Sequence, residues 1–149
     1  MQENESLSRF GNSFQEDLCR IILNDRAFAD QILEVFSSSF LELKHLRLFV
    51  DKIVSYRKKY GVHPTANIMK SIIRTGLDDF PESIQIRIRD YYARCMSNSA
   101  NLDEVEYIKD TALDFCRKQK LKDAIQQSVK LIQNSSFDEV AKIINDALK

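Results

Sequence analysis

The fold is decided by the stretch DEVEYIKDTALDFCRKQKLKDAIQQSVKLIQ, residues Asp103–Gln133. Its apolar residues recur three and four positions apart, which predicts a single helix of about eight turns. The core of a small helical bundle does not require so long a helix. We therefore expect the distal half of this helix to extend beyond its own domain.

The apolar stripe of this helix changes phase near its middle, across Arg117–Lys120. The first half carries Val105, Ile108, Ala112 and Phe115, and the second half carries Leu121, Ile125, Val129 and Ile132. Continuing the first stripe would place Gln119 and Lys122 at apolar positions, so we expect the two halves to face different neighbours. The competing interpretation is an ordinary helix that wraps around an irregular core.

A second, short amphipathic helix is expected after a turn at Asn134–Ser136. Ser136 and Glu139 have the spacing of a capping box at its start. Its narrow apolar face consists of Phe137, Val140, Ile143, Ile144, Ala147 and Leu148. Residues 103–149 are therefore expected to form a helical hairpin that packs partly against something outside this domain.

The composition of the whole chain favours an all-α fold, because only 3 Gly and 2 Pro occur among 149 residues. We expect a flexible N-terminus over 1–12 and a small orthogonal bundle of about five to six helices over 13–102. The C-terminal hairpin follows at 103–149.

Local sequence signals predict where the bundle helices begin and end. Ser13 is expected to cap the first helix and Asp25 the second. The third helix should run from Leu41 and end at Gly61, because glycine accepts the left-handed conformation that often closes a helix. Thr65, which follows a proline, should cap the next helix.

The composition and the lack of a targeting signal in the sequence predict a soluble protein of the cytoplasm. The formal net charge is zero and the pI is near 6.7, which argues against a stand-alone nucleic-acid binder. The chain has an odd number of cysteines without metal-binding spacing, as is typical of free thiols in a reducing compartment; they are Cys19, Cys95 and Cys116. No signal-peptide core or membrane-spanning run is present in the sequence.

The sequence offers no catalytic, cofactor-binding or metal-binding motif. None of the three glycines belongs to a phosphate-binding loop or a dinucleotide fingerprint. We expect His45 to be a surface or boundary residue and His63 to be a packed or solvated turn residue. The chain is therefore predicted not to be an enzyme.

The chain resembles the N-terminal domain of replicative hexameric DNA helicases of the DnaB type, most closely the phage version. The resemblance covers residues 13 to 149 and rests on the order of Phe40 and four segments, Phe14–Asp25, Leu48–Ile53, Tyr60–Thr65 and Tyr107–Leu121. In the last segment, the family has a similar helix with a basic and polar break before a hairpin.

The resemblance implies a role in DNA replication, in a bacterial cell or a phage-infected host. In that family the helical globule and its hairpin form a collar above the motor ring, commonly a trimer of dimers. The collar surrounds the emerging single strand and offers a docking surface for primase or a helicase loader. The P-loop ATPase domain and its linker helix are absent from this sequence, which implies an excised fragment or a stand-alone relative that neither hydrolyses ATP nor unwinds DNA alone.

The leading hypothesis is therefore a non-catalytic collar domain that self-associates through its hairpin. The residues expected at or under that surface are Phe115, Leu121, Ile125, Val129, Ile132, Phe137, Val140 and Ile144. The alternative is a stand-alone helical adaptor that binds a partner helix. A third hypothesis, a DNA-binding regulator, would use phosphate contacts from Lys118, Lys120 and Lys122, although a solvated helix face explains these lysines more simply.

Overall fold

Helices account for the regular structure in the described part of this protein. The computed structural model describes residues 6–97, 102–134 and 137–149, and these ranges contain seven α-helices and no strand. This confirms the predicted all-α fold. The elements are the 3-10 helices η1 (Leu7–Phe10) and η2 (Ser38–Phe40) and the α-helices α1 (Asn12–Asn24), α2 (Arg26–Ile32), α3 (Lys44–Tyr60), α4 (Ala66–Thr75), α5 (Glu82–Ser97), α6 (Leu102–Gln133) and α7 (Phe137–Ala147).

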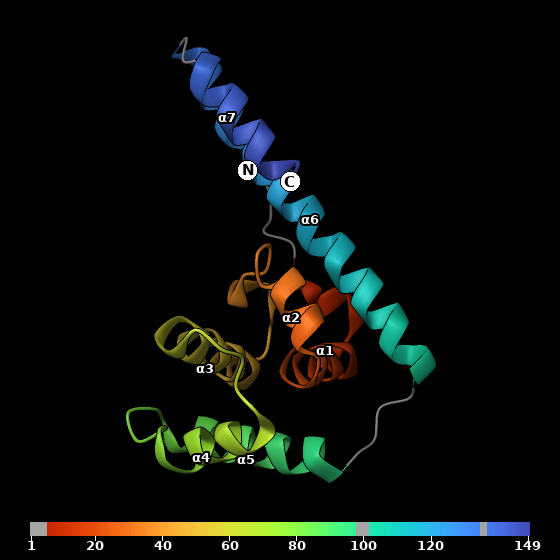
Figure 1. Cartoon of the computed structure of the whole chain (residues 1–149), viewed down its shortest axis with the longest axis vertical. Coiled ribbons are helices and arrows are strands. Elements are labelled where there is room, and N and C mark those ends of the chain that lie inside the picture. The colour runs from red at the N-terminus through yellow and green to blue at the C-terminus, as the bar shows by residue number, and fades with distance from the viewer. Residues whose placement is uncertain (1–5, 98–101, 135–136) are drawn as a thin grey trace.

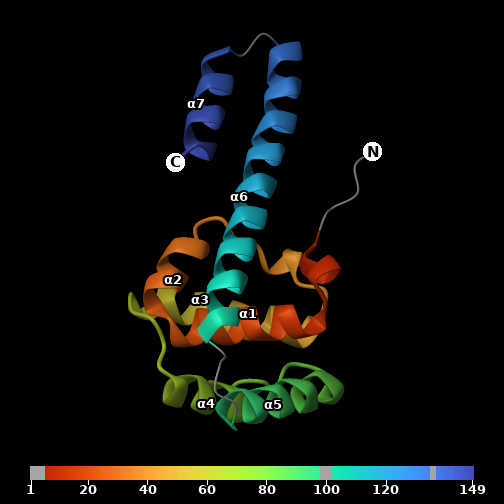
Figure 2. The ribbon, with the colours of Figure 1, turned by 90° about the vertical axis from the view of Figure 1, so that its right-hand side faces the viewer.

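The helices form a small globule from which a hairpin projects. Helices α1, α2 and α3 make the centre of the globule, and the pair α4 and α5 packs on one side of it (Figure 1). The proximal half of α6 packs against α1 and α2, while its distal half continues outward. Figure 2 shows α7 running back alongside this distal half, antiparallel to it. The predicted C-terminal hairpin is therefore present.

The core of the globule joins α1, α3 and α5. Each helix contributes apolar side chains at helical spacing, and burying each one contributes about 1.5–3 kcal/mol. Tyr91, which is 1% exposed, also brings a hydroxyl group into the core. That hydroxyl donates a hydrogen bond of 2.5 Å to the main-chain carbonyl of Glu16, so burial leaves it satisfied. The central members of the core are Leu18, Ile22, Leu46, Phe49, Ile53, Ile88 and Tyr91.

Three predicted helix boundaries are confirmed by their capping geometry. The Asp25 carboxylate accepts a hydrogen bond of 3.0 Å from the Phe28 amide at the start of α2. The Thr65 hydroxyl accepts one of 3.2 Å from the Ile68 amide at the start of α4. Gly61 ends α3 with a φ of 72°, in the left-handed region that costs glycine least.

Of the N-terminal stretch 1–12 that is predicted to be flexible, residues 1–5 lie outside the described residues, and the short helix η1 packs on α1. Leu7 is fully buried within η1, and the Phe10 ring lies 4.9 Å from the ring of Phe14. The apolar side chains of this short turn cover the start of α1. The chain then enters α1 through Gly11 at a φ of 93°, so the predicted cap at Ser13 is wrong.

The third helix also begins later than predicted. Its first residue is Lys44, because η2 and an extended Leu41 precede it. Leu41 is fully buried, and the main-chain amide of Glu42 donates a hydrogen bond of 2.8 Å to the buried side chain of Gln15. These contacts with the core hold the segment out of the helix.

His63 ties the connector between α3 and α4 to the rest of the globule. Its Nδ1 lies 2.8 Å from the Arg57 guanidinium, and its Nε2 lies 2.7 Å from the Leu23 carbonyl. A guanidinium can only donate, so Nδ1 accepts and the Nε2–H group donates to Leu23. Arg57 also donates to the Asp30 carboxylate at 2.6 Å. The imidazole is therefore a packed turn residue that joins the ends of α1 and α3.

Replacing His63 by alanine is expected to lower the free energy of unfolding by about 1–3 kcal/mol, because the Leu23 carbonyl loses its donor and Arg57 its acceptor. Urea denaturation measures this loss. Val62→Ala, at a neighbouring side chain that is 51% exposed, is the control and should change stability by less than about 0.5 kcal/mol. Equal effects of the two substitutions would contradict a role for the hydrogen bonds.

Candidate functional site in the C-terminal hairpin

The proximal half of α6 belongs to the core of the globule. Phe115 is 3% exposed, and its ring makes edge contacts with the rings of Phe40 at 5.4 Å and Phe10 at 6.2 Å. Lys109 adds an ion pair of 2.5 Å with Asp25, and the hydrogen bond from Lys109 lowers the pKa of that carboxyl group. These contacts fix the root of the hairpin to the globule.

Beyond Arg117 and Lys118, which are exposed, α6 turns a different face toward a different neighbour. The buried residues of its distal half are Ala124 and Ser128, one helical turn apart, on the side that faces α7. The two halves of α6 therefore pack against different elements, as the change of phase predicts.

Small side chains form the seam between α6 and α7. Ala124 and Ser128 allow the two helices to approach closely, and the Ser128 hydroxyl donates to the Ala124 carbonyl at 2.8 Å, which satisfies it within the helix. On α7, the apolar side chains at this seam are only half-buried; they are Val140, Ile143 and Ile144. No residue of α7 is fully buried, so a single hairpin covers this helix incompletely.

An apolar face remains exposed on the hairpin. Its side chains are between 50% and 67% exposed, which is high for large apolar groups that follow one another along two adjacent helices. We call this surface the hairpin face, and it consists of Ile125, Val129, Ile132, Phe137 and Leu148.

The geometry of the two helices brings these side chains to one side of the hairpin. Ile125 follows Ala124 and Val129 follows Ser128, so each lies about 100° around α6 from the seam. Leu148 follows Ala147, which is half-buried on α7, and is rotated from the seam in the same sense. The two helices are antiparallel (Figure 2). Equal rotations about antiparallel axes turn both sets of side chains toward the same side of the hairpin.

The structure distributes the residues predicted for self-association over three places. Ile125, Val129, Ile132 and Phe137 lie on the hairpin face. Leu121, Val140 and Ile144 are half-buried within the hairpin. Phe115 lies in the core of the globule, where another chain would not reach it.

The residues predicted for self-association omit Leu148, although the apolar face predicted for the last helix includes it. Sequence reasoning missed Ala124 and Ser128 as the seam. A search for stripes of large apolar residues gives no weight to a serine or to a single alanine. Two small residues four positions apart beside a large apolar stripe would have been the available signal.

The three lysines considered for phosphate binding do not form an open cationic cluster. Lys118 makes an ion pair of 2.9 Å with Asp114, in which both side chains are well exposed. Such a pair contributes about 0.3–0.5 kcal/mol. Lys120 and Lys122 are half-buried along the helix. The hypothesis of a DNA-binding regulator gains no support from their arrangement.

The cysteines lie in surroundings that suppress nucleophilic chemistry. Burial raises the pKa of Cys116 to about 12 and raises the pKa of Cys19 well above its ordinary value. Burial also raises the pKa of Cys95. A thiol that stays protonated at neutral pH is a poor nucleophile and a poor metal ligand. Within residues 6–97, 102–134 and 137–149, no three histidine, cysteine or acidic side chains gather as a metal site would require.

His45 is buried, contrary to the prediction of a surface or boundary residue. It is 8% exposed and its ring lies 6.0 Å from that of Tyr91. The charged residues around His45 in the sequence indicate an exposed position. In the structure, α5 covers this side of α3 and buries the imidazole. Burial lowers the pKa of His45 from its ordinary value of 6.5.

This lowered pKa predicts a loss of stability in mild acid. Below about pH 6.5 the unfolded chain takes up a proton that the folded chain resists, so the free energy of unfolding falls as the pH falls. Urea denaturation between about pH 7.5 and 5.5 measures the slope, which His45→Gln should reduce. The hydrogen bond from Lys109 holds the pKa of Asp25 below its ordinary value of 3.8, away from this window, whereas burial raises the pKa of Asp17 above 3.8. The comparison with His45→Gln, and not the slope alone, therefore assigns the change to His45. An unchanged slope in the variant would contradict this assignment.

No helix in the described part of the chain is long and apolar enough to cross a membrane. Comparison of the chain with protein-family models, with curated proteins and with solved structures finds no match. The exposed hairpin face, together with the sequence, is therefore the basis on which a function can be argued.

Proposed function

We propose that this chain is a non-catalytic domain that self-associates by packing its hairpin face against the same face of a second copy. The observation that carries the proposal is a set of exposed apolar side chains on a projecting hairpin in which α7 has no fully buried residue. Two such hairpins, related by a two-fold axis, would form a four-helix arrangement with a shared core.

The expected energetics are those of a reversible assembly. Burying the exposed parts of five apolar side chains from each copy would contribute several kcal/mol, at about 25 cal/mol per Å². Lost translational and rotational freedom offsets at least about 4 kcal/mol of this. We therefore expect association that depends on protein concentration, with a folded globule in the monomer.

The biological role that we propose is the collar of a replicative hexameric DNA helicase of the DnaB type. It is supported by the sequence resemblance over residues 13 to 149 and by the architecture of a globule followed by a hairpin. In this role the assembled domains would strengthen the ring and surround single-stranded DNA. Primase or a helicase loader would bind to the outside of the collar, in the cytoplasm of a bacterial or phage-infected cell.

The alternative function is that of a stand-alone adaptor. Its hairpin face would take up a helix of another protein, and the chain itself would stay monomeric. The modest size of the face favours this alternative, because one amphipathic helix could cover it. The two proposals share a surface and differ in what occupies it.

Cross-linking through a single introduced cysteine tests whether a second copy of the chain occupies the hairpin face. Val129→Cys places a thiol on the hairpin face, where a short bis-maleimide reagent should give a covalent dimer of the full chain. Lys59→Cys, on an exposed part of the globule, and the unchanged chain are the controls for reaction elsewhere. Dimer from the Val129→Cys chain alone supports self-association through this face, while equal yields or no dimer would contradict it.

A further inference from the structure

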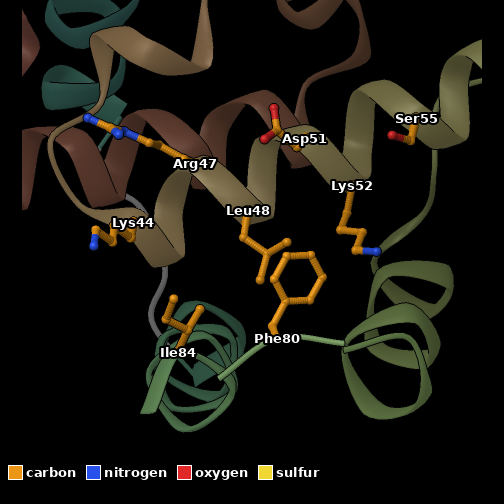
Figure 3. A pocket seen from close by; sticks show the side chains of 8 residues that line it. All are labelled: Lys44, Arg47, Leu48, Asp51, Lys52, Ser55, Phe80 and Ile84. Carbon is orange, nitrogen blue, oxygen red and sulfur yellow. The ribbon is translucent and has the colours of Figure 1, made fainter. Parts of the chain in front are cut away.

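A groove on the globule, separate from the hairpin, combines an apolar floor with a cationic rim. It lies between α3 and the segment that leads into α5, and it has a volume of about 320 Å³. In Figure 3 the Phe80 ring faces Leu48 across the groove, with Ile84 beside it. Lys44, Arg47 and Lys52 line it from α3.

The floor of the groove is held in place by hydrogen bonds to main-chain carbonyls. The Phe80 amide donates to the Leu77 carbonyl at 3.0 Å, and the Gln85 side chain donates to the Phe80 carbonyl at 2.8 Å. Leu48 is 7% exposed, while Phe80 and Ile84 are half-buried. The groove thus offers partly exposed apolar side chains on a fixed frame.

The cations of the rim lack the carboxylate partners that others in this protein have. Arg57 and Lys109 make ion pairs of 2.6 and 2.5 Å with aspartates, whereas Lys44 and Lys52 make none within the described ranges. The Lys52 ammonium instead lies 5.3 Å from the centre of the Phe80 ring.

The third cation, Arg47, is held at the rim by its Nε, which donates to the Leu41 carbonyl at 2.6 Å. Asp51 is the one carboxylate among the described residues that line the groove. Three cations against one carboxylate leave the rim with an excess of positive charge above the apolar floor. A neutral apolar ligand would remove water from these cations without giving them a charged partner, and this desolvation costs free energy.

We propose that this groove docks an acidic amphipathic segment of another protein. Apolar side chains of the segment would lie on Phe80 and Ile84, and its carboxylates would pair with Lys44 and Lys52. This chemistry suits a helix with apolar residues on one face and acidic residues beside them, the arrangement by which helices are bound in grooves. The proposal is independent of the self-association of the hairpin.

The test measures binding of a synthetic probe to the full chain by fluorescence polarisation. The probe is a labelled peptide of about 12 residues with leucine at positions i, i+3, i+4 and i+7 and glutamate beside them. We expect saturable binding that weakens with added salt. The double variant Lys44→Glu/Lys52→Glu should bind at least about tenfold more weakly.

Two controls separate the groove from general electrostatic attraction. Lys58→Glu/Lys59→Glu makes the same change of charge at exposed positions at the end of α3, outside the groove, and should bind as the unchanged chain does. A probe with lysine in place of glutamate should not bind. Phe80→Ala, which leaves all charges in place, should weaken binding and so report on the floor of the groove.

Several results would overturn the proposal. These are absence of saturable binding, equal binding of the lysine probe, and equal loss in the Lys58→Glu/Lys59→Glu variant. Displacement of the probe by single-stranded oligothymidylate would assign the groove to nucleic acid instead. The Lys44→Glu/Lys52→Glu variant should keep the circular dichroism and solution mass of the unchanged chain, since a loss of mass would assign the groove to contacts between copies.

Discussion

The double variant Ile125→Asp/Val129→Asp is expected to be a monomer at concentrations where the unchanged chain associates. Both side chains are about half exposed in the single chain, at 50% and 51%, so the hairpin itself should tolerate the change. At an interface between two hairpin faces, each aspartate would be buried without a partner, which costs several kcal/mol. Light scattering measures the mass, and circular dichroism measures whether the helices persist.

The matched control for this variant is Gln126→Asp/Gln133→Asp. It adds the same two negative charges to the same half of α6 at exposed positions outside the hairpin face. This control should retain the mass of the unchanged chain. Equal loss of mass in both variants would show that net charge, and not the hairpin face, controls association. General loss of helicity in the Ile125→Asp/Val129→Asp chain would show that these residues are part of the core.

Phe115→Ala is expected to lower the free energy of unfolding by about 3–5 kcal/mol, the usual cost of removing a buried phenylalanine ring. The ring is 3% exposed and fills the space between Phe10 and Phe40, so its loss leaves a cavity where α6 joins the globule. Urea denaturation at low protein concentration measures the loss without the contribution of assembly to stability.

Phe137→Ala is the control for Phe115→Ala, because it removes the same ring from a position that is 66% exposed. It should change the stability of the monomer by less than about 0.5 kcal/mol while weakening association. The two substitutions thus distinguish a residue that stabilises the monomer, Phe115, from a residue that contributes to association, Phe137. If both cost the monomer the same stability, the distinction drawn between them is wrong.

Much of the fold follows from local signals in the sequence. Asp25, Gly61 and Thr65 each end or begin a helix as predicted, because a cap depends on residues within one turn of it. The length of α6 and the change of phase near Arg117 follow from periodicity in the same way. These features need no knowledge of the neighbouring elements.

The features that the sequence does not predict depend on contacts between distant segments. Leu7 is buried because α1 lies beneath it, and His45 is buried because α5 covers α3. Ala124 and Ser128 become the seam only when α7 folds back, which in turn decides that Ile125 and Val129 stay exposed. Periodicity identifies these apolar residues, but the position of α7 determines which of them are covered.

Sedimentation equilibrium of the unchanged full chain, over about 1 µM to 1 mM, tests the central claim most directly. If the hairpin face pairs with a second copy, the average mass should rise reversibly with concentration from 17.3 kDa toward twice that value, or toward six times if the collar assembles without the motor. A constant mass of 17.3 kDa across the whole range would contradict self-association and leave the adaptor as the better account.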